Sequence, residues 1–516
     1  MAFILIVGAV LLFPPTPGKA QGLKGITLPP YHWMQDYFFE WQLRHPSKDL
    51  FVTTLPLQFS QLQPLVTQKP TSPFERFLLT QFRTDLESFA PSRKESDSET
   101  ILYFGTRLVE RAGRMADEMR SRLAWRFFSG LSLSKHVEIH NVVNLDQNLK
   151  DDPEYLGKIW RGLTAINEQA YILFHFNTFS IKFGRDYIRW GRGIDATLTV
   201  SDASRPFDQL QFQLRTEKAQ FTYFASKLNT VSLSPQWQEK LKSPWAERYM
   251  TGGRGELALF DHRLQLAATQ MVVWGGRDPE WYFLNPFIFY YGELVNEPDS
   301  LRGNILGSVE LLYYPVPGIE VYGTLMIDDI QVEKTGPGDL EPNEIAWMIG
   351  GRVADPLGTD GLSLGIEYTR VANRTYNTIP EAEKFVHRNK PVGHFLGNDF
   401  DRWLLHARKY LGRHMLLSLT VDLRRRGEGR VNQPFDQPWM NYTVEEGYSE
   451  PFPSGIVERS RMITFDWRWH PRAPFFASLT ARWQKAKNYQ NVEGKTLNRF
   501  EVFINLWWEA QWFFKI

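Results

Sequence analysis

The most regular pattern in this chain is the alternation of apolar and polar residues in its final segment, which continues to the last residue. Side chains of a β-strand point alternately to two faces, so this segment predicts a strand with one apolar and one polar face. A long apolar face that contains tryptophan indicates contact with lipid. The polar face carries Glu501, Asn505, Glu509, Gln511 and Lys515. The apolar face carries Phe500, Val502, Ile504, Leu506, Trp508, Ala510, Trp512, Phe514 and Ile516.

Further segments alternate in the same way, the clearest being 209–214, 362–369, 417–424, 463–470 and 475–483. Segments that are apolar on one face and charged on the other are typical of transmembrane β-barrels, where the two faces meet lipid and lumen. The pattern predicts an all-β membrane protein, an antiparallel transmembrane barrel of about 18 strands. A soluble sandwich or propeller is the alternative, but the chain has no blade-length repeat and its last strand is in phase to the end.

Two details of this prediction concern single segments. Residues 194–201 alternate and are expected to form one of the strands. The tight connections near 315–318 and 412–414 are expected at the periplasmic end, and the long ones at 275–303, 374–400 and 426–455 at the outer end.

The first part of the chain has a different pattern. Segments 31–43, 74–89 and 99–114 place apolar residues at helical spacing. They predict a small helical element over residues 21–118, in the periplasm or as a plug inside the barrel. The barrel is then expected to occupy residues 119–516.

The chain opens with a candidate export signal. The apolar run 2–13 is too short to cross a membrane, and Gly18 and Ala20 follow it as small residues suited to signal peptidase. The pattern predicts a signal peptide over residues 1–20, and the alternative is an uncleaved anchor. Together with the strand pattern, this predicts a multi-pass barrel in the outer membrane of a Gram-negative cell.

Composition narrows the possible functions. The 59 basic and 58 acidic residues give a net charge of +1, so no charge excess favours nucleic acid as a partner. The absence of cysteine excludes disulfides, thiolate metal sites and thiol nucleophiles. Aromatic residues make up 15% of the chain, which suits membrane interfaces and sugar-binding clefts alike.

Several short motifs point to one family. Residues 183–207 read FGRDYIRWGRGIDATLTVSDASRPF, with a Gly-Arg opening, a Trp-Gly-x-Gly turn and a later Arg-Pro. Asn285-Pro286-Phe287 leads to Tyr290-Tyr291-Gly292-Glu293, Tyr322-Gly323-Thr324-Leu325 leads to Asp328-Asp329, and Pro391-Val392-Gly393-His394 precedes Leu396-Gly397-Asn398-Asp399. In this order the motifs resemble the Wzi-type capsule assembly proteins, over most of the chain that follows the signal.

The resemblance implies an 18-stranded outer-membrane barrel with a helical bundle. It implies a lectin that binds capsular or exopolysaccharide and helps to assemble it at the cell surface, without catalysis and without a cofactor. The implied partner is that polysaccharide, and the apolar terminal strand adds outer-membrane lipid and the barrel insertion machinery as expected partners. A porin for small or anionic solutes and a barrel hydrolase are the alternatives that the sequence leaves open.

The candidate polysaccharide-binding residues begin with Arg185, Arg189 and Arg192, which surround Trp190 in a glycine-rich turn. Guanidinium groups bind sugar carboxylates in forked geometry, and an indole ring stacks on a sugar face. The alternative is a row of arginines that neutralises lumen carboxylates such as Asp186 or Asp195.

A second group of candidates comes from an aromatic segment and a later loop. The predicted sugar contacts there are Trp274, Trp281, Tyr290, Tyr291 and His394. The aromatic residues could equally form the core of a loop folded over the barrel mouth, because aromatic side chains bury large areas.

Carboxylates offer weaker candidates. Asp399 and Asp401 share a face if the backbone is extended, so they are candidate calcium ligands, with turn structure or catalysis as alternatives. Asp328 and Asp329 are adjacent on a strand and point to opposite faces. No His-Glu-x-x-His or Gly-x-Ser-x-Gly motif occurs, and no catalytic residue is predicted.

Overall fold

The computed structural model describes residues 26–30, 32–89, 100–115, 118–134, 136–292, 303–333, 335–412, 414–472 and 474–516. The predicted signal peptide, residues 1–20, lies outside this part of the chain. No helix among the described residues is long and apolar enough to cross a membrane.

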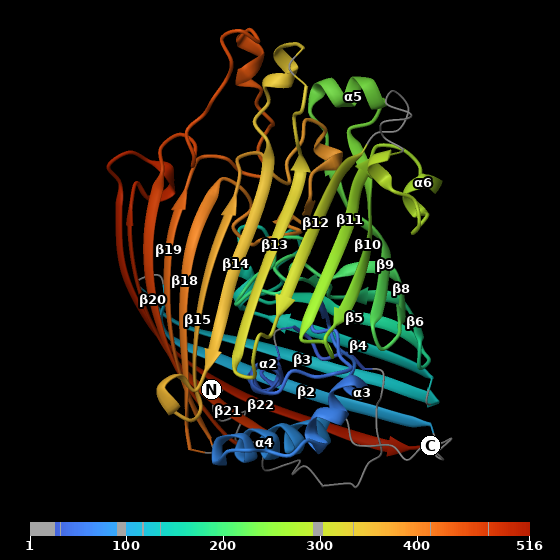
Figure 1. Cartoon of the computed structure of the whole chain (residues 1–516), viewed down its shortest axis with the longest axis vertical. Helices are drawn as coiled ribbons and strands as arrows, with labels where there is room; N and C mark the ends of the chain where they lie inside the picture. Colours follow the sequence, from blue (N-terminus) through green and yellow to red (C-terminus); the bar gives the residue numbers. More distant parts are fainter. Residues whose placement is uncertain are drawn as a thin grey trace.

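The main body is a closed antiparallel β-barrel of 18 strands, as the alternation predicts (Figure 1). Each strand pairs with its neighbours in sequence order, and β2 pairs with β22 to close the barrel. The first nine strands are β2 (Ile101–Met115), β3 (Glu118–Ser134), β4 (Val137–Asp146), β5 (Thr164–His175), β6 (Phe179–Asp186), β8 (Phe207–Arg215), β9 (Ala219–Ser232), β10 (Trp245–Leu259) and β11 (Leu264–Gly275). The others are β12 (Asn304–Tyr313), β13 (Ile319–Asp329), β14 (Glu344–Ala354), β15 (Leu362–Val371), β18 (Phe400–Leu411), β19 (Met415–Arg426), β20 (Glu458–Arg472), β21 (Phe475–Lys487) and β22 (Thr496–Lys515).

The two ends of the barrel differ in their connections. Tight turns such as 216–218 and 314–318 lie at one end, here called the turn end, where β18 is also joined to β19 and where β22 finishes. Long connections such as 372–399 and 427–457, and the described residues 276–292 after β11, lie at the opposite end, here called the loop end (Figure 1). The predicted separation of short and long connections is therefore confirmed.

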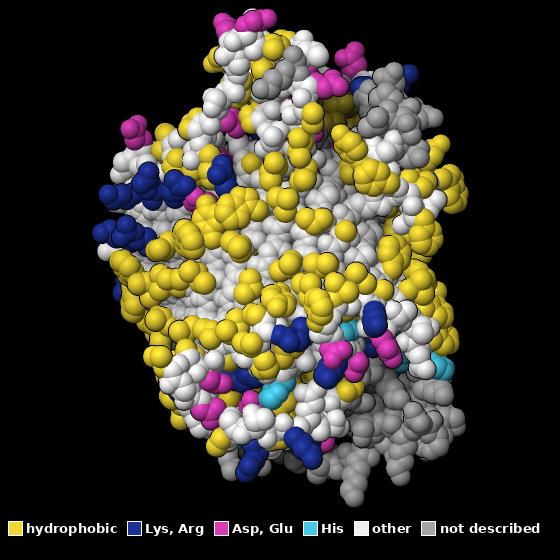
Figure 2. Space-filling view, viewed as in Figure 1, with side chains coloured by type: hydrophobic (Ala, Val, Ile, Leu, Met, Phe, Trp, Pro, Cys, Tyr) yellow, Lys and Arg dark blue, Asp and Glu magenta, His cyan; other side chains and the backbone are white. Residues whose placement is uncertain are grey.

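The outer wall carries a belt of apolar side chains around the middle of the barrel (Figure 2). Outward residues such as Leu257, Ile349 and Phe465 are 44%, 54% and 40% exposed. In β22, Phe500 and Ile504 face outward at 51% and 47%, while Glu509 faces the lumen and pairs with Arg107. The apolar belt has the pattern expected of a lipid-facing wall.

The N-terminal element lies inside and beneath the turn end of the barrel (Figure 1). Its helices are α2 (Met34–Arg44), α3 (Phe59–Leu62), η1 (Gln63–Thr67) and α4 (Pro73–Phe89). The apolar residues of this element and those of the inner barrel wall form one continuous buried core, which includes Trp33, Phe38 and Leu78 together with Phe476 and Tyr410. The element therefore packs as part of the barrel.

Two segments differ from their predictions. Residues 99–114, expected to be helical, form most of strand β2, so the barrel begins before the predicted boundary at residue 118. Residues 194–201, expected to be a strand, fold inward as part of a loop. This loop has an alternating sequence although it is not a barrel strand. Its apolar side carries Leu198 and Val200, its polar side carries Thr197 and Thr199, and both sides are buried. The two errors cancel in the predicted number of strands.

A layer of inward-folded chain crosses the lumen. Strand β1 (Thr54–Leu55) of the N-terminal element pairs with β7 (Arg189–Trp190) of the loop that follows β6. The loop 372–399, with β16 (Val386–His387) and β17 (Lys390–Pro391), packs onto the same layer. The Ser201 amide donates to the Val392 carbonyl at 2.8 Å, and the Tyr376 hydroxyl donates to the Leu198 carbonyl at 2.6 Å. We call β1, residues 187–206 and this loop the plug.

Candidate functional site

The structure places three of the predicted polysaccharide-binding residues inside the plug. Trp190 is fully buried and packs on Phe224, with ring centroids 5.2 Å apart. The Arg192 guanidinium donates to Glu320 at 2.9 Å and lies over the Phe39 ring. Arg189 donates to the Gly193 carbonyl at 3.0 Å. These residues hold the plug in the lumen, and in this conformation they are covered.

Arg185 lies apart from that group. It is on the outward face of β6 near the loop end and forms two hydrogen bonds with the Asp208 carboxylate of the neighbouring strand, one of them at 2.7 Å. The Asp208 carboxylate is partly exposed to solvent, so this is a surface ion pair. The alternative expected an arginine paired with a lumen carboxylate such as Asp186 or Asp195, but Asp186 pairs with Lys182 and Asp195 with Arg402.

The aromatic segment folds against the outside of the barrel wall, where helix α6 (Trp281–Leu284) lies beside β9–β11 (Figure 1). Trp274, Phe283 and Tyr290 are fully buried and form a small core of their own. The Tyr223 hydroxyl of β9 donates to the Leu284 carbonyl at 2.9 Å and fastens the segment to the wall. Trp281 and Tyr291, by contrast, are 84% and 53% exposed.

His394 lies in the inward loop and is fully buried. Its ring stacks on Phe395 and contacts Phe400, and its Nδ1 accepts from the Leu396 amide at 3.2 Å. Burial, reinforced by the positive charge of Arg402, lowers the pKa of His394 to about 3. The side chain is therefore neutral near pH 7 and acts here in packing.

The candidate calcium ligands bind different partners. Asp399 has a φ of 57°, which interrupts the extended backbone. Its carboxylate accepts from the Ser454 amide and hydroxyl at 2.9 and 2.6 Å and from the Gly429 amide at 2.9 Å. Asp401 points to the outer wall, where Arg425 and the Tyr368 hydroxyl donate to it. Among the described residues no group of three or more acidic, histidine or cysteine residues is arranged to hold a metal ion.

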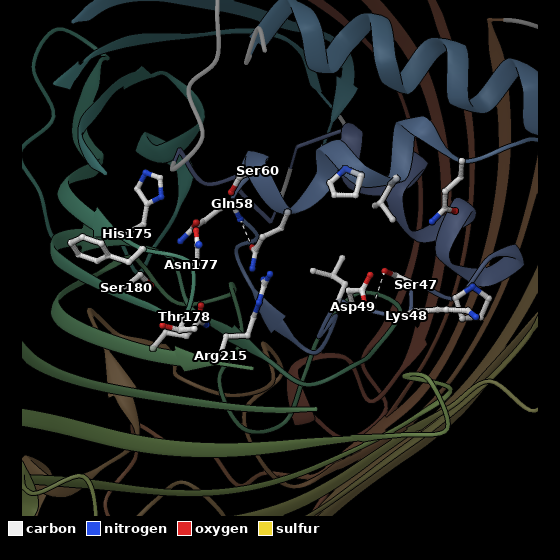
Figure 3. Close-up of a pocket in the computed structure, with 18 of the residues that line it drawn as sticks. Ser47, Lys48, Asp49, Gln58, Ser60, His175, Asn177, Thr178, Ser180 and Arg215 are labelled. Atoms are coloured by element: carbon white, nitrogen blue, oxygen red, sulfur yellow. Dashed lines mark hydrogen bonds between the residues drawn. The ribbon is translucent and has the colours of Figure 1, made fainter. Parts of the chain in front are cut away.

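A large cavity lies at the turn end, between the N-terminal element and the barrel turns (Figure 3). It has a volume of about 1100 Å³. One wall is formed by residues 44–50 and 58–68 of the N-terminal element, and the other by the turn 176–178 and the adjoining ends of β6 and β8. Figure 3 shows Arg215 extending into the cavity between Thr178 and Asp49.

The lining is rich in neutral hydrogen-bonding groups. Phe176 and Phe179 stack at 4.7 Å with an interplanar angle of 15°, and His136 stacks on Phe176 from the preceding turn. Within the described part of the chain, the side chains of Asn177, Ser180 and Arg215 have no hydrogen-bond partner and are available to a ligand. The polar lining residues include Ser47, Gln58, Ser60, Gln61, Gln68, Asn177, Thr178, Ser180, Gln213 and Arg215. Amides, hydroxyls and an aromatic face together suit a saccharide.

Sequence reasoning did not single out this cavity. Its residues come from two short turns, one strand end and a proline-rich part of the N-terminal element, so no linear motif unites them. The one local signal is the run Phe176-Asn177-Thr178-Phe179, a turn with aromatic residues on both sides of two hydrogen-bonding side chains.

Comparison with known proteins gives one strong relationship. The family model "Capsule assembly protein Wzi" matches residues 110–499. A solved Escherichia coli structure, described as Wzi, an outer membrane protein involved in group 1 capsule assembly and a carbohydrate-binding β-barrel, is 14% identical. The alignment covers 95% of this chain and 99% of that one, with a TM-score of 0.62, so the two share a fold.

More distant likenesses involve other barrels. Pseudomonas aeruginosa OprD is 9% identical over 81% of this chain and 97% of its own, with a TM-score of 0.44. Acinetobacter baumannii OccAB2 is 10% identical over 81% and 98%, with a TM-score of 0.46. No curated protein sequence matches this chain significantly. Since the family model covers most of the sequence, including the barrel strands from β3 to β21, this chain belongs to the Wzi capsule assembly protein family.

Proposed function

We propose that this protein is an outer-membrane barrel that binds capsular or exopolysaccharide and helps to assemble it at the cell surface, acting by binding rather than by catalysis. Family membership supports the role in capsule assembly. The apolar belt supports a place in a membrane, with the turn end in the periplasm and the loop end outside.

The observation that carries the proposal is the closed lumen. A barrel of 18 strands leaves a wide aqueous channel unless it is filled. Here the β1–β7 pair and the inward loop 372–399 span it, with Trp190, Leu198 and Tyr376 each at most 1% exposed. A filled barrel presents surfaces for binding and leaves less open lumen for a solute, which favours a binding protein over a porin.

The cavity at the turn end is the candidate contact for the saccharide. Its stacked phenyl rings offer a flat apolar face, and Asn177, Ser180 and Arg215 offer donors beside it. Arg215 would pair with a sugar carboxylate if the polysaccharide is acidic. Trp281 and Tyr291 at the loop end remain the exposed members of the predicted set and form the competing surface.

A binding titration with purified polysaccharide of the producing strain tests this proposal. The variant Asn177→Ala/Arg215→Ala, in detergent-solubilised full-length protein, is expected to weaken binding by at least about tenfold, since two hydrogen-bonding groups are removed from the contact. Trp281→Ala/Tyr291→Ala serves as the matched variant at the other end of the barrel.

The outcomes separate the possible sites. Loss of binding in the Trp281/Tyr291 variant alone would transfer the site to the loop end. Absence of any binding by the wild type, together with a large steady conductance in planar bilayers, would overturn the proposal in favour of a porin.

A further inference from the structure

The outer wall carries one strongly cationic patch. It consists of side chains on the outward faces of β15 and β19–β21, in the last two rows before the loop end. In Figure 2, lysine and arginine side chains gather at the edge of the apolar belt over the loop ends of these strands. We call the patch the cationic wall, and its residues are Arg370, Arg425, Arg459, Arg461, Lys485 and Lys487.

Strand register places like charges directly opposite one another in this wall. Arg459 lies between Arg425 on β19 and Lys487 on β21, and Arg461 pairs with Lys485 in the next row. Directly opposed residues have Cβ atoms about 4.5–5.5 Å apart, and like charges at that distance destabilise the sheet. An anion bound between these cations would offset their repulsion.

The wall itself supplies little negative charge. Asp401 is the carboxylate that pairs with Arg425, at 2.9 Å, and it also accepts from Tyr368. Among the described residues no carboxylate forms an ion pair with Arg459, Arg461, Lys485 or Lys487. Arg459, Arg461, Lys485 and Lys487 are also exposed, so their charges are available to a ligand.

A groove connects these cations to the apolar belt. Its volume is about 710 Å³, and the arginines line its end nearest the loops. Its apolar side is built from Trp403, which is 48% exposed, and from Leu423, which is 38% exposed and lies directly opposite Arg461. The remaining lining residues include Trp347, Ile349, Tyr368, Arg425, Arg459 and Arg461. The groove thus matches a ligand with an anionic head and an apolar body.

We propose that the cationic wall binds the phosphate groups of an acylated glycolipid in the outer leaflet. Guanidinium groups bind phosphate in forked geometry, and each cation near a membrane surface attracts anionic headgroups. The apolar half of the groove lies on the lipid-facing wall, so acyl chains would pack on Trp403 and Leu423. An acidic polysaccharide could meet the charges but would leave that apolar half without a partner.

Two other cations in the described part of the loop-end wall, on β9 and β6, do not share this arrangement. Lys227 on β9 pairs with Glu247 at 2.9 Å, and Arg185 on β6 pairs with Asp208. These two cations have carboxylate partners on the neighbouring strand, unlike Arg459, Arg461, Lys485 and Lys487 of β20 and β21. The lipid site is accordingly expected on this side of the barrel.

The test measures binding of diphosphorylated lipid A to purified full-length protein in neutral detergent, by native mass spectrometry and by titration. The variant Arg459→Gln/Arg461→Gln/Lys485→Gln is expected to weaken binding by roughly a hundredfold, since three cations near the headgroup are removed. Lys227→Gln/Arg185→Gln is the matched control at the same level of the wall and is expected to change binding by less than about threefold. Heat-dependent migration in gels confirms that each variant is folded.

Three further probes separate the sources of the anion. Dephosphorylated lipid A is expected to bind as weakly to the wild type as the phosphorylated lipid binds to the triple variant, and inorganic phosphate at millimolar concentration is expected to compete poorly. Equal lipid A binding by wild type and triple variant would overturn the inference. Loss of polysaccharide binding with retention of lipid A binding in the triple variant would also overturn it and assign the wall to the polysaccharide. Because the wall and the turn-end cavity are separate, failure of either proposal leaves the other measurable.

Discussion

Several buried charges in this protein are paired by side chains from distant parts of the chain. Glu40 of α2 is fully buried, and it accepts from Arg352 on β14 at 2.6 Å and from Arg44 at 2.9 Å. A buried carboxylate without such partners would be strongly destabilising. The buried carboxylate of Glu40 is therefore accommodated in the lumen by one arginine of its own helix and one of the barrel wall.

The two buried histidines of the inward loop predict a dependence on pH. Burial, with the positive charges of Arg388 and Arg402 respectively, lowers the pKa of His387 and of His394 to about 3. In the unfolded loop each pKa returns to about 6.5. The folded loop is then fully stable above pH 6.5 and loses about 1.4 kcal/mol per pH unit for each histidine as pH falls from 6.5 towards 3.

Hydrogen exchange of loop 372–399 at pH 7.5 and pH 4.5 measures this effect. Lower protection factors, each the intrinsic exchange rate at that pH divided by the observed rate, are expected at the lower pH, and the variant His387→Asn/His394→Asn is expected to reduce the difference. Identical protection factors at the two pH values in the wild type would contradict the assignment of buried, neutral rings.

The predicted binding residues show what sequence reveals about a site and what it does not. The Arg-Trp-Gly-Arg turn has the residue types of a sugar contact, yet Trp190 and Arg192 are buried in the plug. Whether these side chains are buried or exposed depends on whether the loop 187–206 folds inward or outward. The inward fold is fixed by pairing of Trp190 with Thr54, which is far away in the chain. A linear pattern carries no information about such a pairing.

At the scale of elements, β1 and β7 form the centre of the plug. The hydroxyls of Thr53 and Thr54 donate to the Glu256 carboxylate on β10 at 2.6 and 2.8 Å, and this ties the plug to the wall. The double variant Thr53→Val/Thr54→Val removes both donors and leaves the buried carboxylate with fewer partners. Loss of each hydrogen bond is expected to lower the stability of the folded plug by about 1–3 kcal/mol.

Planar bilayer recordings measure this change. The wild type is expected to show no steady conductance. The double variant is expected to show intermittent openings, because the plug detaches from the barrel wall from time to time. Thr496→Val, at an exposed strand position, is the control and should behave as the wild type. A double variant as silent as the wild type would mean that the hydroxyls do not hold the plug.

The strands themselves were largely predictable because a lipid-facing wall imposes a strict period of two. The exceptions have physical causes. In strand β2 the apolar residues Ile101 and Tyr103 face the continuous buried core, and Leu102 and Phe104 lie on the other face. Apolar residues are therefore consecutive in the sequence and resemble those of a buried helix. The apparent strand at 194–201 alternates inside the lumen, where both of its faces are buried.

At the scale of the whole molecule, the N-terminal element and the barrel depend on each other for charge balance. Asp36 of α2 pairs with Arg408 on β18 and Arg468 on β20, and Glu40 pairs with Arg352. These contacts join one short helix to three separate barrel strands. The barrel and the helices therefore behave as one folding unit, although their sequence patterns differ.

The variant Asp36→Asn/Glu40→Gln tests this interdependence. It leaves the three barrel arginines without their carboxylates and is expected to lower the free energy of unfolding by about 3–5 kcal/mol. Urea unfolding in detergent micelles, followed by tryptophan fluorescence, measures the loss. Glu87→Gln, an exposed residue of α4, is the control; equal stability of the two variants would show that the ion pairs contribute nothing.

The pairing of β2 with β22 also sets an order of events during biogenesis. These strands stand at the two ends of the barrel sequence, so the wall stays open until the last strand has been synthesised and delivered. By then the segment that carries Thr54 already exists, and its partner Trp190 lies in the middle of the chain. The interior can therefore be filled through the open seam before closure of β2 onto β22 encloses it.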